Sequence, residues 1–322
     1  MSSTFVPETE KRAIFDVPLS TQRYIWVQTF LRNNESLKSI TDFGCGNGRF
    51  IFWLKNVANL EKINFVDCDQ DTIEYNLEGN FQPNLMEMMF GRQNSTNPLE
   101  VCVYHGDVTL PDDRLHADVF SLIEVVEHLP PKQVELACRT IYGYYKPRFV
   151  LITTPNREFN HLLSRDESNR NQFRHYDHKF EWTRTQFQQW AQNICRQYPF
   201  YRVEYDGVGH LEGKSEQYGP CTQIAIFVRQ DDIPFETDNV ADLICCDYLF
   251  DKLQMTEECQ GDRNGNSNQA EPKPVECKLM STYTMPGKKI HEQTDDIRQN
   301  QDCSAVDSDM TTSSDEPTDP SP

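Results

Sequence analysis

The sequence predicts an α/β fold built on a mainly parallel sheet of seven strands, with helices on both faces and an antiparallel hairpin at one edge. Two observations predict this fold. Over the first 230 of the 322 residues, short β-branched apolar runs alternate with segments of helical periodicity, an order typical of parallel sheets. The last two apolar runs leave no room for a helix between them, which favours an antiparallel pair at one edge.

Each element is expected from its own residues. The strands are apolar runs of five to eight residues: Ser39–Gly44, Ile63–Asp67, Glu100–Gly106, Asp118–Glu124, Arg148–Thr154, Arg202–Val208 and Cys221–Val228. Five segments before or between them have helical patterns: Leu19–Arg32, Arg49–Val57, Asp71–Glu78, Pro131–Tyr144 and Thr183–Arg196. The sequence shows no internal repeat.

Charge divides the chain into a body and an acidic tail. Residues 231–322 hold 21 Asp and Glu against 7 Lys and Arg, a net charge of −14, whereas the first 230 residues carry only −5. The tail has too little apolar content to offset chain entropy, so we expect it to be mostly disordered. One apolar stretch in it, Ala241–Phe250, is a candidate for docking on the body or on a partner. We therefore expect an N-terminal extension at residues 1–18, a folded domain at 19–230 and a tail at 231–322.

Composition limits the cellular context. The 11 cysteines show no regular spacing, and the N-terminus lacks the apolar core of a signal peptide. No run approaches the ~18 apolar residues of a membrane span. We expect a reduced, cytoplasmic, soluble monomer without membrane contact. The acidic net charge excludes a protein that binds nucleic acid through bulk basicity, so any such contact needs a local basic patch.

A ligand site is expected where the first three strands end. The turn "DFGCGNGRF" begins at Asp42, and its Gly44 and Gly46 supply a tight bend that a ligand can approach closely. Asp67 ends the second strand, where a carboxylate can hold both hydroxyls of a ribose. Asp107 follows the third strand, near the place where an adenine amino group would lie. Each feature alone has a plainer interpretation, such as an ordinary turn or a helix N-cap. Together at the carboxyl ends of successive strands they predict a site for the methyl donor S-adenosylmethionine.

A second polar cluster follows the fourth strand in "IEVVEHLP". Glu124, Glu127 and His128 stand at i, i+3 and i+4, so a helical turn would place them on one face. Two carboxylates at such a short distance repel each other unless a cation lies between them. Carboxylate oxygens and imidazoles can hold a hard divalent ion. His178 in "FRHYDHKFEWT" is a further candidate ligand. His175 in the same segment is a weaker candidate, because a histidine in a charged loop is more often a solvated side chain than a ligand. The alternative for the whole cluster is a solvated first turn of a helix.

Five segments in this order, "DFGCGNG", "IEVVEHL", "TTPNREFN", "DHKFEWT" and "CTQIAIF", resemble the HUA ENHANCER (Hen) family of small-RNA 3′-terminal 2′-O-methyltransferases over about residues 20–229. The first two segments also resemble runs in ubiquinone-pathway O-methyltransferases, whereas the third and fourth together are much more specific. The resemblance implies a Rossmann-like class I fold that uses S-adenosylmethionine, with donor contacts around Gly44, Asp67 and Asp107. It implies metal ligands at Glu124, Glu127, His128 and His178.

The resemblance also implies a reaction. The enzyme would transfer a methyl group to the 2′-hydroxyl of the 3′-terminal nucleotide of small single-stranded RNAs, which protects that end in RNA-mediated gene silencing. The chain is similar to the short animal form, which implies Piwi-interacting RNAs or Argonaute-loaded short interfering RNAs as substrates and Piwi or Argonaute proteins as partners. Perinuclear RNA granules are then an alternative location within the cytoplasm. The ligand types leave both Mg²⁺ and Mn²⁺ open.

Basic and aromatic side chains near the second histidine segment are candidates for contacting RNA. Arg174 and Lys179 can pair with phosphates, while Tyr176 and Phe180 can stack on bases. Ordinary loop packing explains any one of them equally well. Two other functions remain as alternatives: a small-molecule O-methyltransferase of the ubiquinone-pathway type, and an adaptor that binds the donor or a Piwi protein without turnover.

Overall fold

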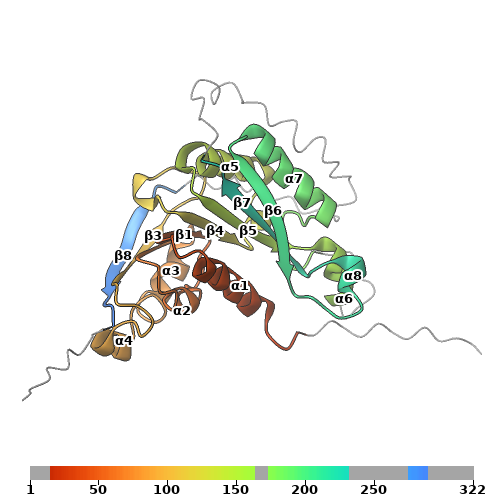
Figure 1. The fold of residues 1–322 in the computed structure, drawn as a ribbon. Coiled ribbons are helices and arrows are strands. Elements are labelled where there is room, and N and C mark those ends of the chain that lie inside the picture. The colour runs from red at the N-terminus through yellow and green to blue at the C-terminus, as the bar shows by residue number, and fades with distance from the viewer. Residues whose placement is uncertain (1–14, 164–172, 232–274, 289–322) are drawn as a thin grey trace, which may run out of the picture. The chain divides into compact units, whose positions relative to one another are not determined.

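An eight-stranded sheet lies at the centre of the computed structural model, which describes residues 15–163, 173–231 and 275–288 (Figure 1). Its strand order is β6-β7-β5-β4-β1-β2-β3-β8, and the five strands β1 to β5 run parallel. Strand β7 is antiparallel to both β5 and β6, which confirms the expected antiparallel pair at one edge. The expectation that no helix fits between these two strands is wrong, because the four-residue helix α8 (Ser215–Tyr218) lies between them. The strands are β1 Ser39–Phe43, β2 Lys62–Asp67, β3 Leu99–His105, β4 Val119–Ile123, β5 Phe149–Pro155, β6 Tyr201–Val208, β7 Thr222–Arg229 and β8 Lys278–Met285.

The eighth strand corrects the predicted number of seven. Strand β8 comes from the acidic tail and pairs antiparallel with β3, with Leu99 opposite Met285. Its residues "KLMSTYTM" include several β-formers, and from Ser281 to Met285 the side chains alternate between more and less exposed positions. The acidic composition averaged over the whole tail hid this short run. Residues 1–14 and the apolar stretch 241–250 lie outside the described residues.

Helices pack on both faces of the sheet (Figure 1). The helix expected at Pro131–Tyr144 is α5, which continues as a π-helical segment, η3, and the helix α7 begins at a capping box formed by Thr183 and Gln186. The other helices were either expected or too short to show a period in the sequence. The α-helices and η3 are α1 Leu19–Asn33, α2 Ile51–Leu54, α3 Gln70–Asn76, α4 Leu85–Phe90, α5 Pro131–Cys138, η3 Arg139–Tyr145, α6 Asn160–Leu163, α7 Arg184–Gln197 and α8 Ser215–Tyr218. Short 3₁₀ turns are η1 Asp113–Leu115, η2 Val126–His128 and η4 Arg157–Phe159.

Successive side chains of the central strands point to opposite faces and build two separate cores. Ile40 of β1 packs with residues of α1, α2 and α3 in one core. Phe43 packs with residues of α5, η3 and α7 in the other. The sheet is therefore rigidly held, and the loops at the carboxyl ends of its parallel strands are the places where a site can form. None of the helices in the described residues is both long and apolar enough to cross a membrane.

Strand β8 gives a first expected outcome. Truncation after Asp231 removes β8 together with its buried Met285, and it exposes the edge of β3 where Met285 lies opposite Leu99. We expect this truncation to lower the free energy of unfolding by at least about 1.5–3 kcal/mol, the usual contribution of one fully buried apolar side chain. Thermal unfolding measures it, and truncation after Lys288, which keeps β8, is the matched control. Equal midpoints for the two proteins would show that β8 does not contribute to the stability of the fold.

Candidate active site

The glycine-rich turn after β1 has a backbone that only glycine suits. Gly44 has a φ of +74°, and a Cβ atom there would lie 2.4 Å from Cγ2 of Val125. The backbone N–H of Gly46 donates a 2.6 Å hydrogen bond to Oδ2 of Asp67, the last residue of β2. The expected glycine turn and the expected ribose-binding carboxylate therefore lie side by side.

Asp107 joins the same corner of the molecule. The backbone N–H of Gly106 donates to the carbonyl oxygen of Asp67 across 2.9 Å, so the loop after β3 lies against the end of β2. Both carboxylates also lie close to Cys68. Burial raises the pKa of the Cys68 thiol to about 11, and the charges of Asp67 and Asp107 contribute to the rise. The carboxylate of Asp107 is oriented by the N–H and hydroxyl groups of Thr109, each 2.8 Å from Oδ1. The ends of β1, β2 and β3 therefore lie next to one another, with Asp67 between the glycine turn and the loop that carries Asp107.

Asp42 occupies a different environment from the other predicted donor-site residues. Its side chain is buried beneath the turn, where Oδ1 accepts a 2.6 Å hydrogen bond from the hydroxyl of Ser121. Burial raises the pKa of Asp42 to about 7, the Ser121 hydrogen bond lowers it, and the charge of Asp67 adds to the rise. The hydrogen bond joins β1 to the neighbouring strand β4 directly before the glycine turn.

The raised pKa of Asp42 predicts a pH-dependent stability. The folded protein keeps a proton on Asp42 that the unfolded chain releases near pH 4, so stability falls as the pH rises from about 4 to about 7. The loss is about 1.4 kcal/mol for each unit that separates the two pKa values. Asp42→Asn keeps the acceptor for Ser121 but cannot ionise, so its stability should change less between pH 5 and pH 8. Chemical denaturation at both pH values tests this, and an equally steep dependence in the variant would contradict it.

The segment after β4 does not form the regular helical turn that the i, i+3, i+4 spacing suggested. Glu124 has a φ of +57°, which is unusual for a residue with a side chain, and it lies two residues before the 3₁₀ turn η2. Its carboxylate accepts a 3.1 Å hydrogen bond from the hydroxyl of Thr153 and lies 3.2 Å from Nη1 of Arg23 on α1. Arg23 was not predicted to be near the site, because α1 is remote from the motif in sequence.

Glu127 is the most informative side chain of the segment. It is fully buried (0% exposed), so the interpretation as a solvated helical turn is wrong for this residue. Its Oε2 accepts a 3.1 Å hydrogen bond from Thr154, while Oε1 has no hydrogen-bond partner among the described residues. Burial, and then the charge of Glu124, raise the pKa of Glu127 well above its usual value. A buried carboxylate oxygen without a donor is costly, and a bound cation would compensate for it.

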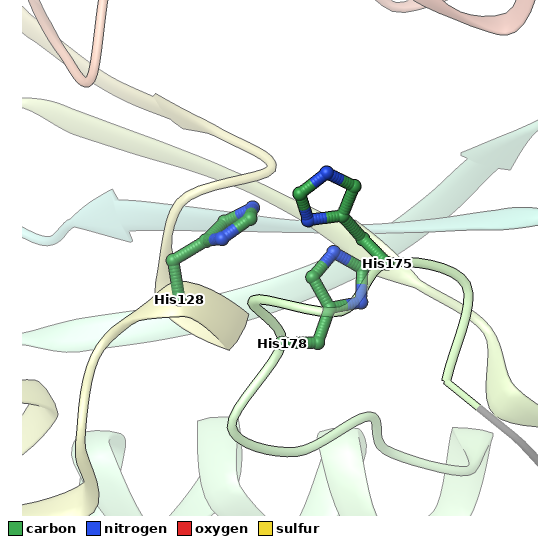
Figure 2. A group of neighbouring side chains, drawn as sticks. All are labelled: His128, His175 and His178. Atoms are coloured by element: carbon green, nitrogen blue, oxygen red, sulfur yellow. The ribbon is translucent and has the colours of Figure 1, made fainter. Parts of the chain in front are cut away.

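Three histidines converge beside this segment (Figure 2). One potential ligand atom each of His128, His175 and His178 lies within 4.8 Å of the others, and the rings of His128 and His178 are 4.8 Å apart between centroids. The backbone N–H of Lys179 donates to the carbonyl oxygen of Glu127 across 2.7 Å, which joins the two segments. Of the four predicted metal ligands, the structure brings the two histidines into this group together with His175, which the sequence favoured less. The carboxylates of Glu124 and Glu127 are not members of the group.

A buried carboxylate that the sequence analysis missed supports His178. Oε1 of Glu181 lies 2.5 Å from Nδ1 of His178 and accepts a 2.6 Å hydrogen bond from the backbone N–H of Arg174. The side-chain amide of Asn160 also donates to Glu181. Histidines that bind metal ions commonly donate their other ring N–H to a carboxylate in this way. The spacing His178-x-x-Glu181 in "DHKFEW" was the available signal.

The predicted RNA-contacting side chains are only partly available. Phe180 is buried in the core, and the guanidinium of Arg174 donates to Asn160 and to backbone carbonyl oxygens. Lys179 forms an ion pair of 2.9 Å with Asp177. Tyr176 is 91% exposed, with its ring centroid 4.3 Å from that of His175, so among the four its side chain is the most accessible to a base.

A divalent cation fits these residues on two observations. Glu127 has a buried oxygen without a donor, and the Nδ1 atoms of His128 and His178 each face a carboxylate, which leaves their Nε2 atoms for a ligand. Mixed oxygen and imidazole ligands suit Mn²⁺ and similar ions as well as Mg²⁺.

No family model matches the sequence. Among curated proteins, the small RNA 2′-O-methyltransferase of Drosophila melanogaster is 33% identical over 236 residues, which cover 72% of this chain and 59% of that protein. The small RNA 2′-O-methyltransferase of Mus musculus is 36% identical over 221 residues, 68% of this chain and 53% of that protein. The chain thus spans a little over half the length of these curated relatives.

Two crystal structures are also similar. That of the small RNA methyltransferase HEN1 has a TM-score of 0.55 and 30% sequence identity, covering 72% of this chain and 28% of that one. That of the methyltransferase domain of bacterial CtHen1 has a TM-score of 0.53 and 26% identity, covering 66% of this chain and 99% of that domain. The match to an isolated methyltransferase domain indicates that the described part of this chain has the extent of such a domain.

Proposed function

Because the chain belongs to the family of small RNA 2′-O-methyltransferases, we propose that it transfers a methyl group from S-adenosylmethionine to the 2′-hydroxyl of the 3′-terminal nucleotide of small single-stranded RNAs. Its fold is that of class I S-adenosylmethionine-dependent methyltransferases, as the sequence predicted. The observation that carries the proposal is Glu127, a buried carboxylate with an unsatisfied oxygen, in the segment after β4 beside the glycine turn.

The donor would bind in the crevice at the ends of β1, β2 and β3. Gly44 and Gly46 let it approach the backbone, and the carboxylate of Asp67, oriented by the N–H groups of Gly46 and Asp69, is directed to accept hydrogen bonds from ribose hydroxyls. Val125 packs against Gly44, so the donor site and the segment that carries Glu124 and Glu127 are in direct contact. A methyl group bound on one side can therefore face an acceptor held on the other.

The terminal ribose of the RNA, which accepts the methyl group, would be held by the segment after β4 and by the loop that carries His178. Glu124, Glu127, His128 and His178 would hold a Mg²⁺ or Mn²⁺ ion. When bound, such an ion lowers the pKa of a ribose hydroxyl and fixes its direction. The residues themselves provide the buried carboxyl group of Glu127, which a bound cation would help to ionise, and imidazoles whose rings are held by Asp177 and Glu181. A terminal ribose with two free hydroxyls is the feature that such a site can recognise without reading sequence.

The decisive experiment compares two RNA oligomers that differ in one atom. One ends in a 2′,3′-diol and the other in a 2′-hydroxyl with a 3′-deoxy ribose. We expect methyl transfer to the diol RNA and very little to the 3′-deoxy RNA. Equal transfer to both would contradict terminal recognition through the diol, and transfer to neither, with turnover of a quinol or catechol instead, would favour a small-molecule methyltransferase.

The physiological substrates and partners extend the proposal. The relatives are small RNA 2′-O-methyltransferases. We extend the proposal to Piwi-interacting RNAs, or Argonaute-loaded short interfering RNAs, presented by Piwi or Argonaute proteins to a monomeric enzyme in the cytoplasm or in perinuclear RNA granules, as the sequence motifs imply. Crosslinking of the chain in cells, followed by sequencing of the bound small RNAs, tests the substrate class. Recovery of unrelated RNAs without enrichment of a small-RNA class would contradict it.

A further inference from the structure

The three imidazoles that cluster in Figure 2 differ in what their Nδ1 atoms contact. Nδ1 of His128 lies 3.0 Å from Oδ2 of Asp177, and Nδ1 of His178 lies 2.5 Å from Oε1 of Glu181. His175 is different, because its Nδ1 accepts a 3.2 Å hydrogen bond from the backbone N–H of Asp177. Two of the Nδ1 atoms therefore face acceptors, and the third faces a donor.

These partners fix where each neutral ring carries its proton. A carboxylate only accepts, so His128 and His178 donate from Nδ1 and keep an unprotonated Nε2 that can bind a metal ion. A backbone N–H only donates, so Nδ1 of His175 is unprotonated and the proton of the neutral ring sits on Nε2. An Nε2–H group is a hydrogen-bond donor and offers no lone pair to a metal. His175 therefore has a different chemistry from its neighbours, although its ring centroid lies only 5.8 Å from that of His128 and 5.6 Å from that of His178.

We propose that His175 is a substrate-contacting residue rather than a metal ligand, and that its Nε2–H donates a hydrogen bond to an oxygen atom of the RNA 3′ end. This inference rests on the proposed function, which brings the RNA terminus to the histidine cluster. The exposure of His175 supports this proposal, because an RNA molecule can reach an exposed side chain, whereas His178 is buried. The next residue, Tyr176, is 91% exposed and continues the same surface.

The loop holds His175 in place for this role. The backbone N–H of His178 donates to the carbonyl oxygen of His175 across 3.2 Å, so both the main chain and the ring of His175 are fixed within one turn. The carboxylate of Asp177 is already engaged by Nδ1 of His128 at 3.0 Å and by Nζ of Lys179 at 2.9 Å. The donor on His175 is thus held in a defined position beside the predicted metal ligands.

Two variants of the full chain test the role of His175. His175→Ala removes the donor, whereas His175→Gln places an amide N–H near the position of Nε2. His116→Ala, which removes a half-exposed imidazole paired with Asp113, is the matched control. The affinity for a diol RNA is measured by fluorescence anisotropy with S-adenosylhomocysteine present, and the affinity for Mn²⁺ by electron paramagnetic resonance without RNA.

We expect His175→Ala to bind the diol RNA about tenfold more weakly, the effect of losing one hydrogen bond to a substrate oxygen. Its affinity for Mn²⁺ should equal that of the wild type, and His175→Gln should recover most of the RNA affinity. A marked loss of Mn²⁺ binding in His175→Ala would overturn the proposal, because it would make His175 a ligand. Unchanged RNA binding would overturn it as well.

The identity of the acceptor oxygen follows from two modified RNAs. One lacks the terminal 3′-oxygen, and the other carries an uncharged methylphosphonate at the last linkage. The modification that removes the acceptor should weaken binding to the wild type but cause no further loss in His175→Ala. If both modifications weaken the two proteins equally, His175 contacts neither oxygen and the proposal fails. Failure of the proposed function looks different, because wild-type protein would then not methylate the diol RNA at all.

Discussion

Glu127→Ala is expected to abolish most methyl transfer while leaving donor binding nearly intact. The variant removes a buried carboxylate from the predicted metal site, and water cannot replace the negative charge that it supplies. We expect turnover with a diol RNA to fall at least 100-fold, in the range found when groups that stabilise developing charge are removed. Turnover is measured at saturating donor, with EDTA added to the wild type as a reference for the metal-free rate.

Two further variants separate charge from shape. Glu127→Gln keeps the volume and the acceptor for Thr154 but has no charge, so it should be nearly as inactive as the alanine variant. Glu78→Ala removes an exposed acid at a distance from the motif and should retain full activity. Excess Mn²⁺, which binds such ligand sets more tightly than Mg²⁺, should partly restore Glu127→Gln. Turnover of Glu127→Ala at the wild-type rate would exclude Glu127 from a metal site.

Asp67→Ala should have the opposite effect, with a loss of donor binding. Both oxygens of this carboxylate accept backbone hydrogen bonds, from Gly46 and Asp69, which fix its orientation at the end of β2. Losing the contact to two ribose hydroxyls should weaken binding of S-adenosylmethionine by on the order of 1–3 kcal/mol, about 5- to 150-fold in the dissociation constant. Calorimetry measures it directly.

The control for Asp67→Ala is Asp71→Ala, which removes an exposed acid in the first turn of α3. It should bind the donor as the wild type does. A folded Asp67→Ala protein with undiminished donor affinity would remove Asp67 from the donor site and, with it, the main support for the position of the ribose. Turnover alone cannot decide this, because a saturating donor concentration can mask the loss.

The strands could be predicted because burial on both faces leaves a clear record in the sequence. Each of the seven expected strands lies within one residue of its observed bounds, since the parallel strands are continuous apolar runs that end at a turn or a polar residue. Strand β8 could not be predicted in this way. It is half exposed at the edge of the sheet, and its pairing with β3 depends on contacts remote in sequence.

The site was predictable to the extent that its chemistry lies in short motifs. Residue type and spacing were enough to select His128, His178 and Glu127, but they gave no burial, and burial is what distinguishes Glu127 from a surface acid. They also gave no hydrogen-bond partners. For this reason Glu181 was missed, and the sequence did not show that the exposed His175 has its ring in the cluster.

The late position of β8 in the chain has a consequence for protein synthesis. Cys102 of β3 and Thr282 of β8 are neighbours in the sheet but are separated by 180 residues. At the usual rate of translation, the ribosome needs roughly 10–40 s to reach the second strand after it has made the first. During that time β3 is an open edge that can pair with other nascent chains, so neighbouring polysomal chains are at risk of coaggregation. We expect chaperone dependence to be greatest while this edge is open.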